Sequence, residues 1–119
     1  MRPLGWVGSA RDDLLTFPED AVREIGHALY LAQTGGKHAD AKPLKGFGGA
    51  GVLEVVEDHD GDTYRAVYTV QFCDVVYVLH AFQKKAKKGN ATPPHEIETV
   101  RRRLKRAEEE YQAWKTRTP

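Results

Sequence analysis

Apolar side chains recur at helical spacing in two long stretches of the sequence, one near each end. The first stretch lies between Pro18 and Gly35, and its apolar positions are Ala21, Val22, Ile25, Leu29 and Ala32. The second begins at Thr92 and Pro93, which suit the cap and the first turn of a helix. Its apolar positions are Ile97, Val100, Leu104, Ala107, Tyr111 and Trp114. Intervals of three and four residues predict two amphipathic helices, and a shorter helix is expected to begin at Ser9.

Between these helices the pattern changes to short runs of β-branched and aromatic residues. Runs at 52–58, 63–72 and 75–82 predict strands, and the turns between them are short enough to require antiparallel pairing. An apolar segment at 4–7 predicts one more strand, whereas the stretch 37–51 predicts a mobile loop. The expected fold is therefore α+β, a small antiparallel sheet packed against an N-terminal helix pair and a C-terminal helix.

Composition adds limits on where the protein works. With 119 residues, 40% of them hydrophobic and 29% charged, the sequence is expected to form one domain spanning residues 1–119. The single cysteine, Cys73, excludes an internal disulfide and a multi-cysteine zinc site. No apolar run approaches the roughly 20 residues that span a bilayer, and the N-terminus lacks the apolar segment of a signal peptide. A cytoplasmic protein with no membrane partner is expected.

The charges are divided unevenly along the chain, although the net charge is only +1. Residues 1–62 carry six Lys/Arg against eleven Asp/Glu, and residues 63–119 carry twelve against six. Four lysines directly follow the third predicted strand: Lys84, Lys85, Lys87 and Lys88. This distribution predicts a basic face that suits nucleic acid or an acidic partner, unless the two halves neutralise each other in the fold.

Arg65 lies near the middle of the second predicted strand. Alternation there places Tyr64 and Ala66 against the helices and Arg65 on the opposite, more open face. The next strand ends at the lysine run, so Arg65 and one or more lysines can meet around one phosphate. Lysines crowded together have lowered pKa values, so one could act as the base in metal-free RNA cleavage while Arg65 clamps the phosphate. A basic patch that only aids solubility explains the lysines equally well.

The histidines offer acid–base chemistry at neutral pH. His95, in the first turn of the last predicted helix, is the better candidate, whereas His80 in a buried strand is expected to be a core histidine. His27 and His38 are expected to be structural or solvated. Because the histidines are scattered and no His, Cys or Asp cluster has ligand spacing, the sequence predicts no metal site. The glycine-rich run at 46–51 lacks the Walker and dinucleotide patterns, so a nucleotide site is not predicted either.

Several motifs resemble those of one protein family. They are YRAVY at 64–68, HAFQKK at 80–85 with the lysine run behind it, and HEI at 95–97. The segments LYLAQTG at 29–35 and KPLKG at 42–46 fit the same pattern. In these motifs and in the order of predicted elements, nearly the whole sequence resembles the RelE/ParE toxin superfamily, in particular its phage-derived, HigB-like branch.

The resemblance implies a toxin of a type II toxin–antitoxin system that inhibits translation as a ribosome-dependent mRNA endonuclease (mRNA interferase). It implies no metal or other cofactor, and as partners the ribosome, mRNA and a cognate antitoxin with a helix-turn-helix domain. The oligomeric state is left open. In the family, a strand arginine and basic residues after the last strand act on the RNA backbone. The expected catalytic residues are therefore Arg65, Lys84 and Lys87, together with His95, and the expected RNA ligands are Lys45, Lys85 and Lys88.

The sequence departs from RelE at two places. RelE has a tyrosine just after its basic loop, where this chain has Pro93-Pro94-His95. RelE also has lysines on the strand before its arginine, where this chain has Glu54, Glu57 and Asp58. Two other functions therefore stay open: ParE-like, non-enzymatic inhibition of DNA gyrase, and an inactive remnant that only binds an antitoxin or nucleic acid.

Overall fold

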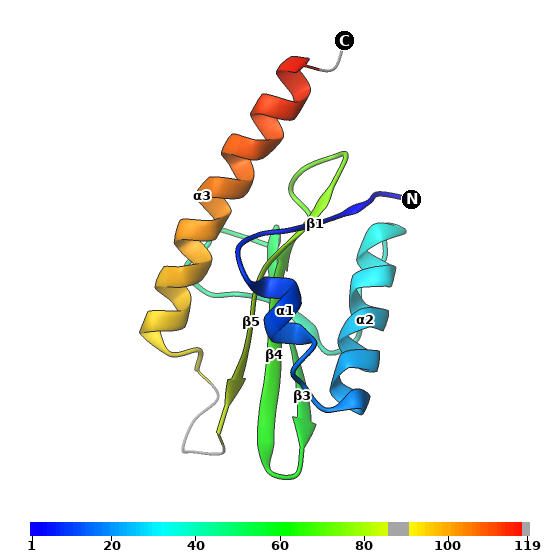
Figure 1. Ribbon diagram of the computed structural model, residues 1–119, viewed down its shortest axis with the longest axis vertical. Coiled ribbons are helices and arrows are strands. Elements are labelled where there is room, and N and C mark those ends of the chain that lie inside the picture. The colour runs from blue at the N-terminus through cyan, green and yellow to red at the C-terminus, as the bar shows by residue number, and fades with distance from the viewer. Residues whose placement is uncertain (86–90, 118–119) are drawn as a thin grey trace.

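The computed structural model describes residues 1–85 and 91–117, which form a five-stranded sheet and three helices (Figure 1). The strands are β1 (Leu4–Trp6), β2 (Ala41–Pro43), β3 (Val52–His59), β4 (Asp62–Thr69) and β5 (Val76–Lys84). The helices are α1 (Ala10–Leu14), α2 (Glu19–Gln33) and α3 (Pro94–Arg117). Within the sheet the strands lie in the order β1-β5-β4-β3-β2. The predicted α+β class is confirmed.

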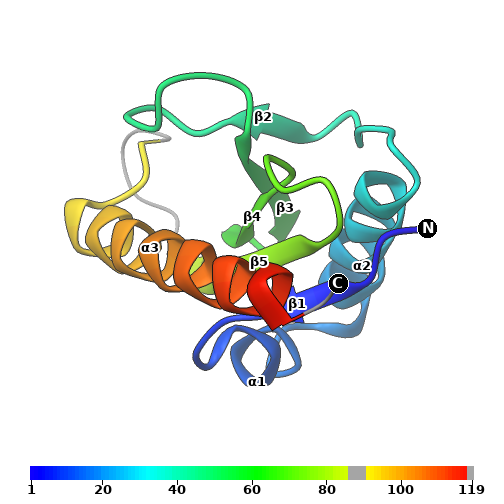
Figure 2. The same ribbon diagram turned by 90° about the horizontal axis from the view of Figure 1, so that it is seen from above.

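The sheet separates two hydrophobic cores. On one face, α1 and α2 pack against strand residues that include Val55, Ala66 and Tyr68. On the other face, α3 packs against the sheet through residues that include Val100 and Ala107. Figure 2 shows α2 and α3 on opposite sides of the sheet. The periodic apolar stripes therefore become two separate cores, one on each face of the sheet.

The last turns of α3 extend beyond the sheet (Figure 1). Trp114, the last position of the predicted apolar stripe, is therefore 41% exposed, whereas Tyr111 one turn earlier is buried. Within the described ranges, the structure contains no helix with the length and apolar content needed to cross a membrane.

The sheet differs from the predicted one in three places. It is mixed rather than purely antiparallel, because β1 pairs in parallel with β5. Part of the stretch predicted as a mobile loop forms the edge strand β2, which pairs with β3. β4 ends at Thr69, and its pairing with β5 shifts register between Val67 and Tyr68. All three features arise from how strands pair with one another, β1 with the distant β5 and the others with neighbouring strands, and a local apolar pattern does not report pairing.

His80 links β5 to α3. Its Nδ1 accepts a hydrogen bond from Arg103 Nη1 at 3.2 Å, so the ring proton lies on Nε2, which donates to Glu96 Oε1 at 2.7 Å. Burial lowers the pKa of His80 below its ordinary 6.5. The hydrogen bond and charge of Glu96 oppose this shift, while the charge of Arg103 adds to it. The side chain is thus the core histidine expected from the sequence. It holds the start of α3 close to β5.

Replacing His80 by glutamine should make folding less sensitive to acid. The unfolded chain protonates His80 below about pH 6.5, while the native ring stays neutral to lower pH. The wild type therefore loses stability as the pH falls through this range, and the variant lacks that contribution. Urea unfolding at about pH 7.5 and about pH 5.5 measures the difference. Equal losses in the two proteins would show that His80 already titrates normally in the native state.

Candidate functional site

A cavity of about 450 Å³ lies on the sheet face that carries Arg65. Its lining comes from β3, β4 and the segment around β2: Ala39, Asp40, Lys42, Pro43, Glu54, Val56, Asp58, Thr63 and Arg65. Val56 lies directly opposite Arg65 in the pairing of β3 with β4. Because alternate residues of a strand share a face, this lining lies on the side of the sheet away from α1 and α2.

Arg65 is buried in the wall of this cavity, with only 2% of its surface exposed. Its Nε donates to Thr63 Oγ1 at 3.2 Å, and its Nη1 donates to Glu54 Oε1 at 3.4 Å. The predicted face of the strand is confirmed, but the expectation of an open position is wrong, because neighbouring side chains cover the guanidinium. The planar guanidinium that binds this carboxylate has the geometry to bind a phosphate as well.

Glu54 is the acidic partner of Arg65 in the cavity. Its side chain is 11% exposed, and its second oxygen, Oε2, accepts a hydrogen bond from the Thr92 hydroxyl at 2.8 Å. Burial raises the pKa of Glu54 above the usual 4.5, while the Thr92 hydrogen bond and the charges of Arg65 and Lys84 oppose that rise. A buried carboxyl group with a raised pKa beside a guanidinium is a candidate proton acceptor near neutral pH.

Thr92 contacts the site and does not cap α3 as predicted. The helix begins later, at Pro94, and the Pro93 carbonyl accepts hydrogen bonds from the amides of Glu96 and Ile97. The Thr92 hydroxyl instead reaches across to Glu54 on β3. The segment before α3 therefore helps to enclose the carboxylate.

Lys84 stands at the end of β5, next to the same residues. In the pairing of β4 with β5 it lies opposite Thr63, whose hydroxyl donates to the Lys84 carbonyl at 3.1 Å. Its Nζ donates to the Ala91 carbonyl at 2.8 Å. Its charge also lowers the pKa of Glu54. The structure thus places Lys84 near the pair that Arg65 and Glu54 form.

The other expected site residues have different surroundings. Lys45 lines a second cavity, of about 470 Å³, which shares Glu54 with the first. His95 is in the first turn of α3, and its side chain is 78% exposed, so it lines neither of these cavities. Lys85 is exposed just beyond β5, while Lys87 and Lys88 lie outside the described residues.

The sequence-based expectations do not include Glu54 as a functional residue. A signal for it exists, because the short turn at residues 59–62 sets the register of β3 against β4. Alternation from that turn places Glu54 on the same face as Arg65. A carboxylate and a guanidinium in one cavity, with the Lys84 ammonium group near enough to lower the pKa of the carboxyl group, can bind an anion and move protons to and from it.

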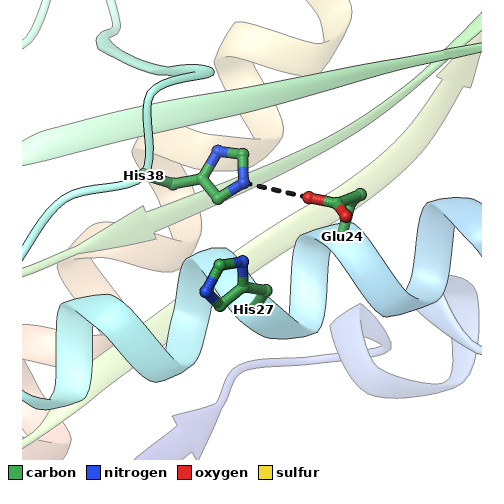
Figure 3. Close-up of side chains that lie close together, drawn as sticks. All are labelled: Glu24, His27 and His38. Atoms are coloured by element: carbon green, nitrogen blue, oxygen red, sulfur yellow. Dashed lines mark hydrogen bonds and ion pairs between the residues drawn. The ribbon is translucent and has the colours of Figure 1, made fainter.

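A second group of ionisable side chains lies between α2, the segment after it and β3. The rings of His27 and His38 have centroids 5.4 Å apart, and His38 Nε2 is 3.1 Å from Glu24 Oε1 (Figure 3). Burial, followed by the nearby Asp40 and Glu24 carboxylates, raises the pKa of Glu57 to about 7. Two of the five histidines that are scattered in the sequence, His27 and His38, are therefore brought together by the fold, and with Glu24 they form a group that could hold a metal ion.

A family comparison places the chain among phage-derived proteins. Residues 12–105 match the family model described as "Phage derived protein Gp49-like (DUF891)". No curated protein matches the chain. Because the family match covers well over half of its length, the chain belongs to the Gp49-like family, a toxin-like family of toxin–antitoxin systems. Membership of such a family suggests an antitoxin as a partner.

Proposed function

We propose that this Gp49-like protein is the toxin of a type II toxin–antitoxin system and cleaves mRNA on the ribosome, as HigB-like toxins do. The observation that carries the proposal is the buried pair of Glu54 and Arg65 in a cavity, with Lys84 beside it. These groups can supply the base, the anion ligand and the acid that RNA cleavage without a metal requires. The proposed partners are the ribosome, mRNA and an antitoxin with a helix-turn-helix domain.

The proposed reaction is attack of a ribose 2′-oxygen on the adjacent phosphorus atom. Glu54 takes the proton of the 2′-hydroxyl as the new oxygen–phosphorus bond forms. Arg65 binds the non-bridging oxygens and stabilises the negative charge that develops on them. The bond to the 5′-oxygen then breaks, and the Lys84 ammonium gives its proton to that oxygen. The products are a 2′,3′-cyclic phosphate and a 5′-hydroxyl.

This proposal assigns the base to a carboxylate rather than to a lysine. The acidic residue that departs from the RelE pattern becomes the proton acceptor, and its raised pKa suits that role. Glu54 also holds Arg65, so an incoming phosphate has to share the guanidinium with it. The five N–H donors of arginine allow such sharing.

Expression of the chain in growing bacteria, followed by primer extension on ribosome-bound mRNA, tests the proposal. We expect growth arrest, mRNA cut within the coding region, and rescue when the gene next to this one is co-expressed. Growth arrest with intact mRNA and DNA damage would instead indicate a gyrase inhibitor. Harmless expression would indicate a remnant that only binds an antitoxin or nucleic acid.

Replacing Thr92 by valine should shift the acid side of the pH–rate profile to higher pH. The Thr92 hydrogen bond lowers the pKa of Glu54, so its loss raises that pKa, and the base is then protonated over a wider range of pH. Single-turnover cleavage between about pH 5 and about pH 8 measures the shift. Thr99→Val is the matched control, because within residues 1–85 and 91–117 the Thr99 hydroxyl donates to the His95 carbonyl of α3 and to no group of the site. An unchanged profile for Thr92→Val would remove Glu54 from the role of base.

A further inference from the structure

We propose that Glu24, His27 and His38 form a binding site for a divalent transition-metal ion, for which Zn²⁺ is the best fit. Glu24 and His27 lie one turn apart on α2, and His38 comes from the segment that follows the helix (Figure 3). One ligand atom from each of the three side chains lies within 4.8 Å of the other two. The site lies on the other face of β3 from the proposed nuclease site and does not depend on that proposal.

The donor atoms and their spacing suit zinc. Two imidazoles and one carboxylate are a common set of three protein ligands for Zn²⁺, with water as the fourth ligand. Two ligand atoms about 2.0–2.1 Å from one tetrahedral ion lie about 3.3 Å apart. His38 Nε2 and Glu24 Oε1, at 3.1 Å, already have nearly this separation. His27 is exposed, so rotation about its side-chain bonds can bring its ring to the same ion.

The surroundings of His38 can support a metal-bound ring. The Asp40 amide donates to His38 Nδ1 at 3.0 Å, which places the ring proton on Nε2, facing Glu24. An ion at Nε2 takes the place of that proton, and the ring proton moves to Nδ1 at the expense of the amide hydrogen bond. Asp40 Oδ2 lies 3.8 Å from Nδ1, beyond hydrogen-bond distance, so the Asp40 side chain has to move closer to accept that proton. Carboxylates in this position orient histidine ligands and increase their basicity.

The local charge also favours a cation. Glu57 and Asp40 form a second possible ligand group with His38, next to Glu24. Across residues 1–85 and 91–117, no lysine or arginine forms an ion pair with any of these three carboxylates. Among the described residues, the buried Oε2 of Glu57 has no hydrogen-bond partner by geometry, although the Asp40 side chain lies close enough to the Glu57 carboxyl group to raise its pKa. A buried carboxylate oxygen that accepts no hydrogen bond is costly, and a nearby divalent ion reduces that cost.

A bound ion would tie α2 to the segment that leads into β2. Asp40 and Lys42 of this segment line the cavity that contains Arg65, so the ion would hold one wall of that cavity from outside. It takes no part in the proposed cleavage of RNA. The inferred role is structural, because the ion cross-links two segments that the chain otherwise joins through a loop.

Isothermal titration of the full chain with ZnCl₂, after treatment with a chelator, tests this site. We expect one Zn²⁺ per chain, with affinity reduced about tenfold or more by His27→Ala and by Glu24→Gln. Both residues are exposed on α2, so neither substitution should prevent folding. His59→Ala is the matched control, because His59 also lies beside a carboxylate, 3.4 Å from Asp60, but outside the cluster.

A second measurement separates a built site from weak surface binding. A given Zn²⁺ concentration should raise the melting temperature of the wild type and of His59→Ala by more than that of His27→Ala, because tighter binding to the native state stabilises it more. A wild-type chain that binds no Zn²⁺ would overturn the proposal. So would Zn²⁺ binding whose affinity is unchanged by either His27→Ala or Glu24→Gln.

Discussion

Replacing Arg65 by lysine should slow the cleavage of ribosome-bound mRNA by about 100-fold or more, while the protein stays folded. Lysine keeps a positive charge beside the buried Glu54, but it cannot present two parallel N–H donors to a phosphate. Primer extension with purified protein, ribosomes and mRNA measures the rate. Expression of the variant in bacteria should no longer arrest growth.

The choice of lysine and the control follow from the burial of Arg65. Alanine would leave the Glu54 carboxylate buried without its partner, at a cost of about 3–5 kcal/mol in folding stability, so an inactive Arg65→Ala variant would be ambiguous. Arg2→Lys is the matched control, since Arg2 is a half-buried arginine that donates to the carbonyls of Ala32, Val70 and Phe72. It should lose stability but cleave normally. Near-normal cleavage by Arg65→Lys would show that Arg65 does not bind the reacting phosphate.

Replacing Glu54 by glutamine should also lower the cleavage rate by about 100-fold or more, because glutamine cannot take a proton from the 2′-hydroxyl. The amide keeps the length of the side chain and can still accept the Thr92 hydrogen bond. RNA binding should be equal or tighter, since a neutral amide competes less with phosphate for Arg65. Single-turnover kinetics and RNA titration measure the two effects separately.

Glu57→Gln is the control for this experiment. Glu57 lies on the same strand as Glu54 but on the opposite face, so its replacement should leave cleavage unchanged. If Glu54→Gln cleaves as fast as the wild type, the proton acceptor is another group, and one of the lysines after β5 becomes the candidate again. Loss of RNA binding together with cleavage would instead indicate that Glu54 mainly holds Arg65 in place.

The elements of this fold could be predicted because they depend on local patterns. The apolar stripes that predict α2 and α3 become buried faces of those helices, and the β-branched runs become β3, β4 and β5. The two short strands, β1 and β2, show the limit of prediction from local patterns. The position of β1 is set by parallel pairing with β5, which lies about 70 residues later, and that of β2 by pairing with β3 across the glycine-rich stretch between them; neither pairing is visible in the short strand's own residues.

The candidate site was predicted only in part, for the same reason. Alternation along β4 places Arg65 on the correct face, because side-chain direction in a strand is a local property. Its burial is not local, since it depends on Glu54 from β3. Thr92 shows the same limit, because a good capping residue instead binds a carboxylate that lies 38 positions earlier in the chain.

The sequence by itself therefore determined the α+β class, the main helices and strands, the face that carries Arg65, and the resemblance to phage-derived toxins that the family match supports. Only the tertiary structure decided which ionisable groups meet. It joined Arg65 to Glu54 across two strands, and it brought His38 back against α2 beside His27 and Glu24. Periodicity reports how each segment is oriented, whereas contacts between segments depend on how the cores pack, and both sites proposed for this protein lie at such contacts.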